Sequence, residues 1–496
     1  MTPLTLGILT DKELPAFLET ALLQAEEQGW LSFTVFRQPA PHKTGFARFD
    51  DWVYRKYILL ETKLLAQKRA APPGKFSQRA PAEITGLDRQ RWDALLFLCE
   101  RAPARTTQTA HGKWTFSASE YSAFWDVFHG RKTSVCELLA DGRPIRRAVI
   151  NTDPNSVVRQ REHVVSKNTG LLIQSLRILH SQGKITQLRP AAYTPSRAAP
   201  PNLILVCWRL LQIFGRKLKA KLEGRFRFTQ WSLMIALQEN PPPDWNVFQP
   251  IVSPREVFWA DPFPIERGGR RYIFIEEFLY STRLGRIACL EIDDGGRVTD
   301  RRTVLEKPYH LSYPFIFEHQ GRLFMIPESG KNKTVDLYSC TAFPYEWKFV
   351  KTLMEGTAAF DTTLLEHAGK WWMFVNLQDE GGSSWDTLHL FYADNPVNGR
   401  WTPHPLNPIV QDVSSARPAG RIFRRDGVLI RPSQDSSQRY GYATKFNRIL
   451  RLSETEYEEQ CEYTFAPARP SHILATHTWN SIAGLTAIDA VIYRRA

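Results

Sequence analysis

The chain has 496 residues, 43% of them apolar and 23% charged, a composition typical of soluble globular proteins. This length exceeds one ordinary hydrophobic core, so we expect two or three domains. The net charge of +13 favours an anionic partner such as anionic lipid, an acidic glycan or nucleic acid. Because the charge is not concentrated in one block and no zinc-finger or RNA-binding motif occurs, we expect no nucleic-acid partner.

The cysteines and the first residues of the chain bear on its cellular compartment and on metal binding. Six cysteines lie far apart without a Cys-x-x-Cys pair, which argues against a metal site and a disulfide-bonded scaffold. The chain starts with a strand-like segment, residues 4–9, and no signal peptide precedes it. No apolar run reaches the roughly 18 residues of a membrane span. We therefore expect a cytoplasmic protein without a metal or cofactor.

Residues 1–195 alternate between strand and helix patterns. Residues 4–9 and 31–36 are strand-like, and residues 13–28 between them repeat apolar side chains at helical spacing. Residues 94–98 form another apolar run. This alternation predicts an α/β domain with a parallel sheet. No Gly-x-Gly-x-x-Gly motif follows the first strand, so nothing supports a nucleotide site there.

Residues 196–225 are predicted to be a linker and one amphipathic helix. Residues 188–202 are rich in Pro, Ala and Ser, as linkers often are. An apolar segment, residues 203–214, is then followed by a basic tail. Two interpretations stay open: a helix packed between domains, or a helix that rests on an anionic membrane surface through residues 203–221. The second would place the protein at the inner face of the membrane.

From residue 226 onward, the sequence changes to short strands separated by turns. A strand, glycine turn and strand recur in residues 259–274, 311–326 and 359–374, and more loosely in 416–430. The spacing of about 50 residues is that of a propeller blade. Residues 229–237 and 484–493 can close one more blade. We therefore predict an all-β five-bladed β-propeller over residues 226–496, with four or six blades as alternatives.

Equivalent positions of the repeats converge on the axis of a propeller, because the first strand of each blade lines the channel. Asp261, Tyr313 and Asp361 occupy one such position. Two carboxylates from separate blades suit glycosidic chemistry, one as base or nucleophile and one as its electrostatic partner. Glu328 ends an apolar strand, where a raised pKa would suit a general acid. The alternative is that these carboxylates cap turns.

Other polar residues at strand ends and in the fourth repeat are candidates for substrate binding. Arginines in a funnel suit phosphate or carboxylate groups. The candidates are Glu277, His310, Tyr313, Arg417, Arg421, Arg431 and Asp435. Glu276 also ends a second strand, and His477 and Asn480 could face the funnel. No pair among these residues has the spacing diagnostic of a metal site.

Several motifs together resemble a known domain. They are Trp259-Ala260-Asp261-Pro262-Phe263, Leu311-Ser312-Tyr313-Pro314, Ile326-Pro327-Glu328-Ser329, Asp361-Thr362-Thr363-Leu364 and Arg417-Pro418-Ala419-Gly420-Arg421. The set resembles the propeller at the N-terminus of plant glucosamine inositolphosphorylceramide transferases, and more widely the five-bladed propellers of glycoside hydrolase family 43. The latter resemblance implies a general base at Asp261 and a pKa-tuning role at Asp361. That family's acidic Glu follows its second Asp, whereas Glu328 precedes Asp361.

The N-terminal half resembles a formyltransferase-like domain that is fused to this propeller in bacteria. Active formyltransferases carry Asn-x-His-x-Ser, where this chain has Thr115 and Ser117 in place of Asn and His. The resemblance therefore implies a degenerate scaffold that lacks a group to polarise a formyl carbonyl.

Three functions remain open from the sequence. The propeller could act on a glycan or glycosyl-phosphate in cell-surface polysaccharide or glycolipid metabolism. It could instead be a non-catalytic glycan-binding or scaffold propeller for a partner glycosyltransferase. Formyl or acyl transfer by the N-terminal domain is a third function, which the missing Asn and His oppose.

Overall fold

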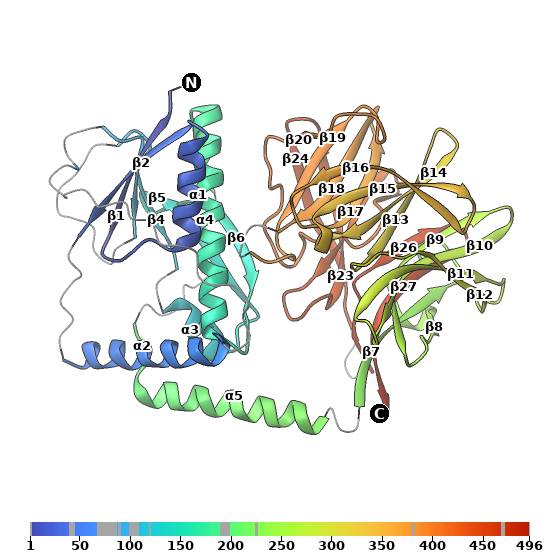
Figure 1. Ribbon diagram of the computed structural model, residues 1–496, viewed down its shortest axis with the longest axis horizontal. Coiled ribbons are helices and arrows are strands. Elements are labelled where there is room, and N and C mark those ends of the chain that lie inside the picture. Colours follow the sequence, from blue (N-terminus) through green and yellow to red (C-terminus); the bar gives the residue numbers. More distant parts are fainter. Residues whose placement is uncertain are drawn as a thin grey trace. The chain divides into compact units, whose positions relative to one another are not determined.

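The computed structural model describes residues 2–38, 45–66, 87, 91–98, 109–118, 121–188, 199–223, 227–378, 382–467 and 472–495. Cys99 and most of the predicted linker, residues 189–198, lie outside these ranges. The chain divides into two compact units, one of residues 1–219 with 379–382 and one of residues 220–378 with 383–496. Figure 1 shows the elements of both units.

The first unit is α/β and contains a six-stranded sheet in the order β2-β1-β3-β4-β5-β6. Its strands are β1 (Leu4–Thr10), β2 (Leu31–Arg37), β3 (Ala94–Phe97), β4 (Lys113–Phe116), β5 (Thr133–Ala140) and β6 (Arg143–Asn151). The first four pair in parallel, but β4–β5 and β5–β6 pair antiparallel. The parallel prediction was therefore wrong for β5 and β6. These strands form a hairpin through Asp141 and Gly142, both at positive φ, and need no helical crossover.

Five helices complete the first unit: α1 (Ala16–Glu27), α2 (Gly45–Ala66), α3 (Ser122–Phe128), α4 (Val157–Gln182) and α5 (Leu203–Glu223). Leu18 and Leu22 of α1 share one core with Leu172 and Leu176 of α4 and with the apolar face of the sheet. Helices α2, α3 and α5 meet in a second core with the start of α4. Figure 1 shows α2 and α5 running side by side.

The second unit is a five-bladed β-propeller, which confirms the predicted fold of this region. The first two blades are β9 (Val257–Arg267), β10 (Arg270–Leu279), β11 (Leu284–Ile292) and β12 (Val298–Leu305), then β13 (Ser312–His319), β14 (Arg322–Ser329), β15 (Thr334–Ala342) and β16 (Glu346–Glu355). The next two are β17 (Ala359–His367), β18 (Lys370–Leu377), β19 (Leu388–Ala393) and β20 (Thr402–Pro403), then β21 (Phe423–Arg425), β22 (Val428–Asp435), β23 (Ala443–Leu452) and β24 (Tyr457–Phe465). In each of these blades, consecutive strands are neighbours in the sheet.

The fifth blade joins both ends of this unit. It contains β7 (Arg227–Ala236), β8 (Gln249–Ile251), β25 (Ile473–Ala475), β26 (Trp479–Ile482) and β27 (Leu485–Arg495). Strands β7 and β27 pair antiparallel over their whole shared length, from Arg227 opposite Arg495 to Ala236 opposite Thr486. The ring is therefore closed by the strands that the sequence predicted. This pairing ties the two ends of the propeller together within one blade, and each blade keeps its outermost strand as an edge.

Candidate functional site

Asp261, Tyr313 and Asp361 occupy equivalent places on the inner strands β9, β13 and β17. Their φ angles are 51°, 42° and 52°, in the left-handed region that non-glycine residues rarely adopt. The pairing of each inner strand with the next strand shifts in register at this place. The three side chains are 4%, 0% and 1% exposed. The same backbone distortion therefore recurs in three blades at buried polar residues, and such distortions cluster at functional sites.

A second layer of polar residues comes from the second strand of each blade. Glu276, Glu328 and Asn376 pair with the residues just before Asp261, Tyr313 and Asp361, respectively. All three second-strand side chains are buried. The blades therefore place two successive layers of polar groups in the interior, and the sequence repeat had indicated mainly the first.

Arg417 of the fourth repeat holds two predicted catalytic carboxylates together. Its guanidinium donates to Asp361 at 2.5 and 3.2 Å and to Glu328 Oε2 at 3.1 Å. Gln434 Nε2 donates to Asp361 Oδ2 at 2.7 Å. Burial raises the pKa of Glu328 well above its usual value, Arg417 opposes this, and Asp361 raises it further. Burial lowers the pKa of Arg417, but Asp361, Tyr440 and Glu328 outweigh this and raise it.

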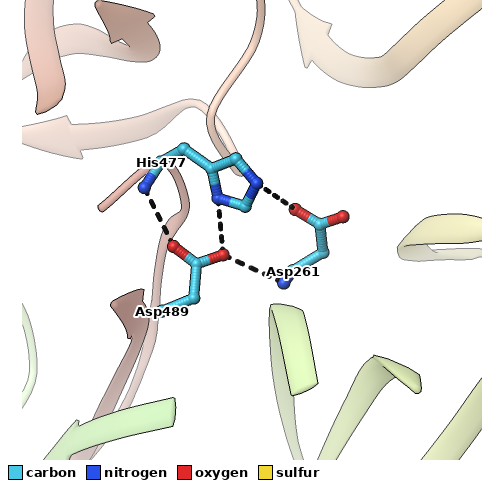
Figure 2. A group of neighbouring side chains, drawn as sticks. All are labelled: Asp261, His477 and Asp489. Atoms are coloured by element: carbon cyan, nitrogen blue, oxygen red, sulfur yellow. Dashed lines mark hydrogen bonds and ion pairs between the residues drawn. The ribbon is translucent and has the colours of Figure 1, made fainter. Parts of the chain in front are cut away.

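Asp261 lies in a second cluster, with His477 and Asp489, which Figure 2 shows. His477 Nδ1 is 2.6 Å from Asp489 Oδ2, and its Nε2 is 3.8 Å from Asp261 Oδ1. Asp261 also accepts hydrogen bonds from Thr478 Oγ1 at 2.8 Å and from the Tyr313 backbone N–H at 3.2 Å. Burial raises the pKa of Asp261 to about 6, although His477 lowers it. Burial opposes a charged His477, yet Asp489 and Asp261 raise its pKa overall.

The same three residues are the group in the described part of the chain that could hold a metal ion. One ligand atom from each of Asp261, His477 and Asp489 lies within 4.8 Å of the others. However, the His477 ring already pairs with Asp489, and Asp261 already accepts from Thr478. These contacts give the three side chains hydrogen-bonding and ion-pair partners, so they account for the arrangement without a bound ion.

A cavity of about 620 Å³ opens beside these clusters. Its polar lining comes from Glu276, His310, Ser312, Glu328, Lys331, Lys333, Arg417, Tyr440 and His477. Its aromatic lining comes from Trp231, Phe258, Phe278 and Phe360. A concave site with aromatic walls and a few convergent polar groups is typical of small-molecule and sugar binding sites.

Glu276 and His310 lie next to each other on the cavity wall. His310 Nδ1 accepts a hydrogen bond from the Gly285 backbone N–H at 2.9 Å, so the ring proton lies on Nε2. This Nε2 is 3.3 Å from Glu276 Oε1, an oxygen that accepts no hydrogen bond from the described residues. Burial lowers the pKa of His310 to about 4, helped by Lys331 and Arg417. Burial also raises the pKa of Glu276 well above its usual value.

The structure brings only some of the predicted site residues to this cavity. Glu328, His310 and Arg417 line it, whereas Asp261, Asp361 and Tyr313 lie buried behind it. Tyr313 instead joins blades, because its hydroxyl accepts from the Gly420 N–H and bonds to Thr363, both at 2.8 Å. Asp261 and Asp361 therefore do not line the cavity, and their catalytic roles stay a prediction.

Four other predicted binding residues lie away from the cavity. Glu277 pairs with Arg286 and Arg301 because neighbouring residues of a strand face opposite sides. Arg421 donates to the backbone oxygens of Pro264 and Ile316 and lines a different cavity. Arg431 pairs with Glu459, and Asp435 lies 3.9 Å from Lys445. Of the fourth-repeat arginines, only Arg417 reaches the candidate site.

Sequence reasoning missed several lining residues. Trp231 of β7 stacks on His477 with ring centroids 4.2 Å apart, and Phe258 stacks on Phe278 at 4.6 Å. Tyr440 packs edge-on against His477 at 5.3 Å and lies beside Arg417. Lys331 and Lys333 come from a short turn after β14. Their periodicity is that of ordinary strand and turn residues, so no signal in one sequence separates them from core aromatics or surface lysines.

Comparison with known proteins bears on the propeller. Residues 245–484 match the family described as glucosamine inositolphosphorylceramide transferase 1, N-terminal. The propeller of this chain belongs to that family. The transferase 1 protein of Oryza sativa subsp. japonica is 34% identical over 227 residues, which are 43% of this chain and 30% of the relative. The Arabidopsis thaliana protein is 31% identical over 251 residues, 48% and 32% of the two chains. The chain spans about a third of the length of these curated relatives.

The solved structures that are similar to this propeller are remote from it in sequence. A family 117 glycoside hydrolase from Zobellia galactanivorans has 13% identity and a TM-score of 0.36, covering 53% of this chain and 90% of its own. The catalytic domain of a GH62 α-L-arabinofuranosidase from Coprinopsis cinerea has the same identity and score, covering 53% and 96%.

Proposed function

We propose that the propeller binds the sugar part of a glycan or glycosyl-phosphate in the 620 Å³ cavity, within cell-surface polysaccharide or glycolipid metabolism. The observation that carries this proposal is the pairing of aromatic walls with buried polar groups that still have hydrogen-bonding capacity. Glu276 Oε1 is one such group. The relatives are named as glucosamine inositolphosphorylceramide transferases, and glucosamine is a sugar, which agrees with a sugar ligand.

Charge on the lining suggests how an anionic group on the sugar would be held. Arg417 is committed to Asp361 and Glu328, but the exposed Lys331 and Lys333 also line the cavity. Ammonium groups bind phosphate as point charges. A glycosyl-phosphate would therefore place its sugar between the aromatic rings and its phosphate toward these two lysines.

The hydrogen bonds of Asp261 and Asp361 favour a propeller that binds a glycan without catalysing a reaction. Both oxygens of Asp361 and both of Asp261 already accept hydrogen bonds, and neither residue lines the cavity. A base or nucleophile must reach the atom it attacks. The propeller would then present a glycan to a partner glycosyltransferase.

Catalysis is a second candidate, supported by the acids on the cavity wall. Glu328 has a raised pKa, as the predicted general acid requires, and Glu276 shares this property. In this version, Asp261 is the base and Asp361 its electrostatic partner. Asp261→Asn should then lower turnover by about 100-fold or more while glycan binding survives. Unchanged turnover in this variant would remove the catalytic assignment.

The binding proposal is tested with a glycan array that includes hexosamine-terminated oligosaccharides and glycosylated inositol phosphates. The wild-type protein should retain at least one class of these glycans. Phe258→Ala removes one aromatic wall, and Glu276→Gln changes the acid whose Oε1 accepts no hydrogen bond from the described residues. Each should therefore weaken this binding about tenfold or more. Phe349→Ala is the matched control, because Phe349 lies on the outer strand β16 and is 55% exposed. Equal binding by all four proteins would contradict the proposal.

The first unit supports no comparable proposal for formyl transfer. Thr115 lies on β4, where the formyltransferase motif would need Asn. The resemblance places that family's later Asp near Asp141, which accepts a hydrogen bond from the Lys113 backbone N–H at 2.9 Å. We propose that this unit is catalytically silent. Formyltransferase turnover by the full chain, lost on changing Asp141→Asn, would contradict this.

A further inference from the structure

Helix α5 has its polar and apolar faces reversed relative to an ordinary surface helix. Arg209 is 0% exposed and donates to the Pro154 backbone oxygen at 2.7 Å, and Arg216 donates to the same oxygen at 2.8 Å. Gln212, between them, accepts from Arg209 at 3.4 Å. These three residues are spaced at i, i+3 and i+7, so they form one face, and that face is turned inward.

The outward face of the same helix is apolar. Ile204, Trp208, Leu211, Phe214 and Leu218 are 77%, 56%, 62%, 67% and 48% exposed. Their spacing of three and four residues keeps them on one stripe that runs the length of the helix. Exposing large apolar side chains in a continuous stripe is unfavourable in water, and such patches mark interaction surfaces.

Helix α2 of the same unit enlarges this surface. It packs beside α5 in the core that contains Val53, Tyr57 and Val206 (Figure 1). Its outward side chains include Trp52 and Leu59, each 54% exposed. Lys56 lies over the Trp52 ring, 5.7 Å from its centroid, as a basic side chain at a membrane interface can.

We propose that the apolar stripe of α5, with the exposed residues of α2, inserts into the surface of an anionic lipid bilayer. Charge complementarity selects this occupant. The sequence in which α5 ends is basic, because residues 217–227 contain five basic residues and one acidic residue, and the chain as a whole carries +13. A helix with an aromatic and aliphatic face and a basic end lies in the plane of an anionic interface. Among the described helices, none has an apolar stretch long enough to cross a membrane.

This binding would place the first unit at the surface of a bilayer. The proposal stands independently of the cavity, because its residues belong to the other unit. Glycan binding by the propeller and lipid binding by α5 can therefore succeed or fail separately in experiments.

The first test is sedimentation of the full chain with vesicles of phosphatidylcholine, with or without phosphatidylglycerol. We expect binding to the anionic vesicles and little binding to the neutral ones. The combined change Trp208→Ser, Leu211→Ser and Phe214→Ser should weaken binding at least about 100-fold, since each removes a large apolar side chain. The matched control, Phe349→Ser with Val350→Ser, removes exposed apolar residues from the propeller and should bind like the wild type. Equal binding by the triple variant would overturn the proposal.

The second test places a fluorescent label on the helix itself. Cys207 of α5 and Cys461 of the propeller are both exposed cysteines. With Cys99, Cys340 and Cys461 changed to Ser, an environment-sensitive label on Cys207 should brighten on anionic vesicles and resist aqueous quenchers. A label on Cys461, with Cys207 changed to Ser, should not respond. A Cys207 label that stays in water on the vesicles, or that is already shielded in a dimer without vesicles, would overturn the proposal.

Discussion

Asp361 of the third repeat and Arg417 of the fourth bind each other, with Arg417 Nε 2.5 Å from Asp361 Oδ2. The side chains are 2% and 7% exposed, so the pair is buried. Arg417 also lies 5.2 Å from the Phe360 ring and 5.1 Å from the Tyr440 ring. One guanidinium therefore joins the structural carboxylates to the wall of the cavity.

Arg417→Ala should destabilise the protein strongly. It leaves Asp361 and Glu328 buried without their cation, and breaking a buried pair in this way costs about 3–5 kcal/mol. Urea unfolding at neutral pH measures this loss. Arg451→Ala is the control, because Arg451 pairs with Glu456 and Glu458 while 61% exposed, and it should change stability little. A comparable loss of unfolding free energy in both variants would contradict the expectation that the buried pair matters more than the exposed one.

Tyr313→Phe should destabilise the propeller although it keeps the ring. The change leaves the buried Gly420 N–H without its acceptor, a cost of about 1–3 kcal/mol. Tyr463→Phe removes a hydroxyl that also bonds to backbone, at 3.2 Å to Pro243, but Tyr463 is 37% exposed. Thermal unfolding should separate the two, with the smaller loss at Tyr463. No loss at Tyr313 would show that its hydroxyl does not hold the blades together.

Gly420→Ala should disrupt the contact between the fourth and fifth blades. A Cβ at Gly420 would lie 2.1 Å from the Trp479 backbone oxygen, and the φ of +130° is strained for any other residue. We expect a loss of about 3 kcal/mol or more. Gly427→Ala has a φ of +78° but open space around it, so it should cost about 1 kcal/mol. Similar stabilities of these two variants would contradict the close approach of Gly420 to the Trp479 backbone oxygen.

His310 should make stability depend on acid pH. The pKa of His310 in the folded protein is about 4, below the ordinary histidine value of 6.5. The stability it contributes is therefore present above pH 6.5 and is lost as the pH falls through 4. At about 1.4 kcal/mol per pKa unit, the loss is up to about 3 kcal/mol. Asn at position 310 can still accept from Gly285 but does not titrate. The stability advantage of the wild type over His310→Asn should therefore shrink between pH 7 and pH 4, and a constant difference would contradict the assignment.

The blade architecture was predictable from sequence because each inner hairpin repeats a strand, a glycine turn and a strand. The site was predictable only in part. Repeat phase identified Asp261, Tyr313 and Asp361 as equivalent, and all three share a left-handed φ. The repeat phase could not show that these three residues lie behind the cavity. The position of a residue along the propeller axis depends on how far its strand extends past the neighbouring strands.

Other misses have equally local causes. Glu276 lines the cavity and Glu277 does not, although they are adjacent, because strand residues alternate in direction. A shift of one residue in register would have exchanged them. In the first unit, the Asp141-Gly142 turn reversed a strand that periodicity alone could not orient. The sequence did not reveal that the polar face of α5 is turned inward. Arg209 is buried because it binds the backbone oxygen of Pro154, which is distant in sequence.

The central claim is that the cavity of the propeller holds a sugar. A crystal structure of the full chain, soaked with the glycan that scores highest on the array, tests it most directly. We predict sugar density between Phe258 and Phe360, with a hydroxyl within hydrogen-bonding distance of Glu276 Oε1. A glycan bound elsewhere on the protein, or a cavity without sugar at saturating concentration, would contradict the claim.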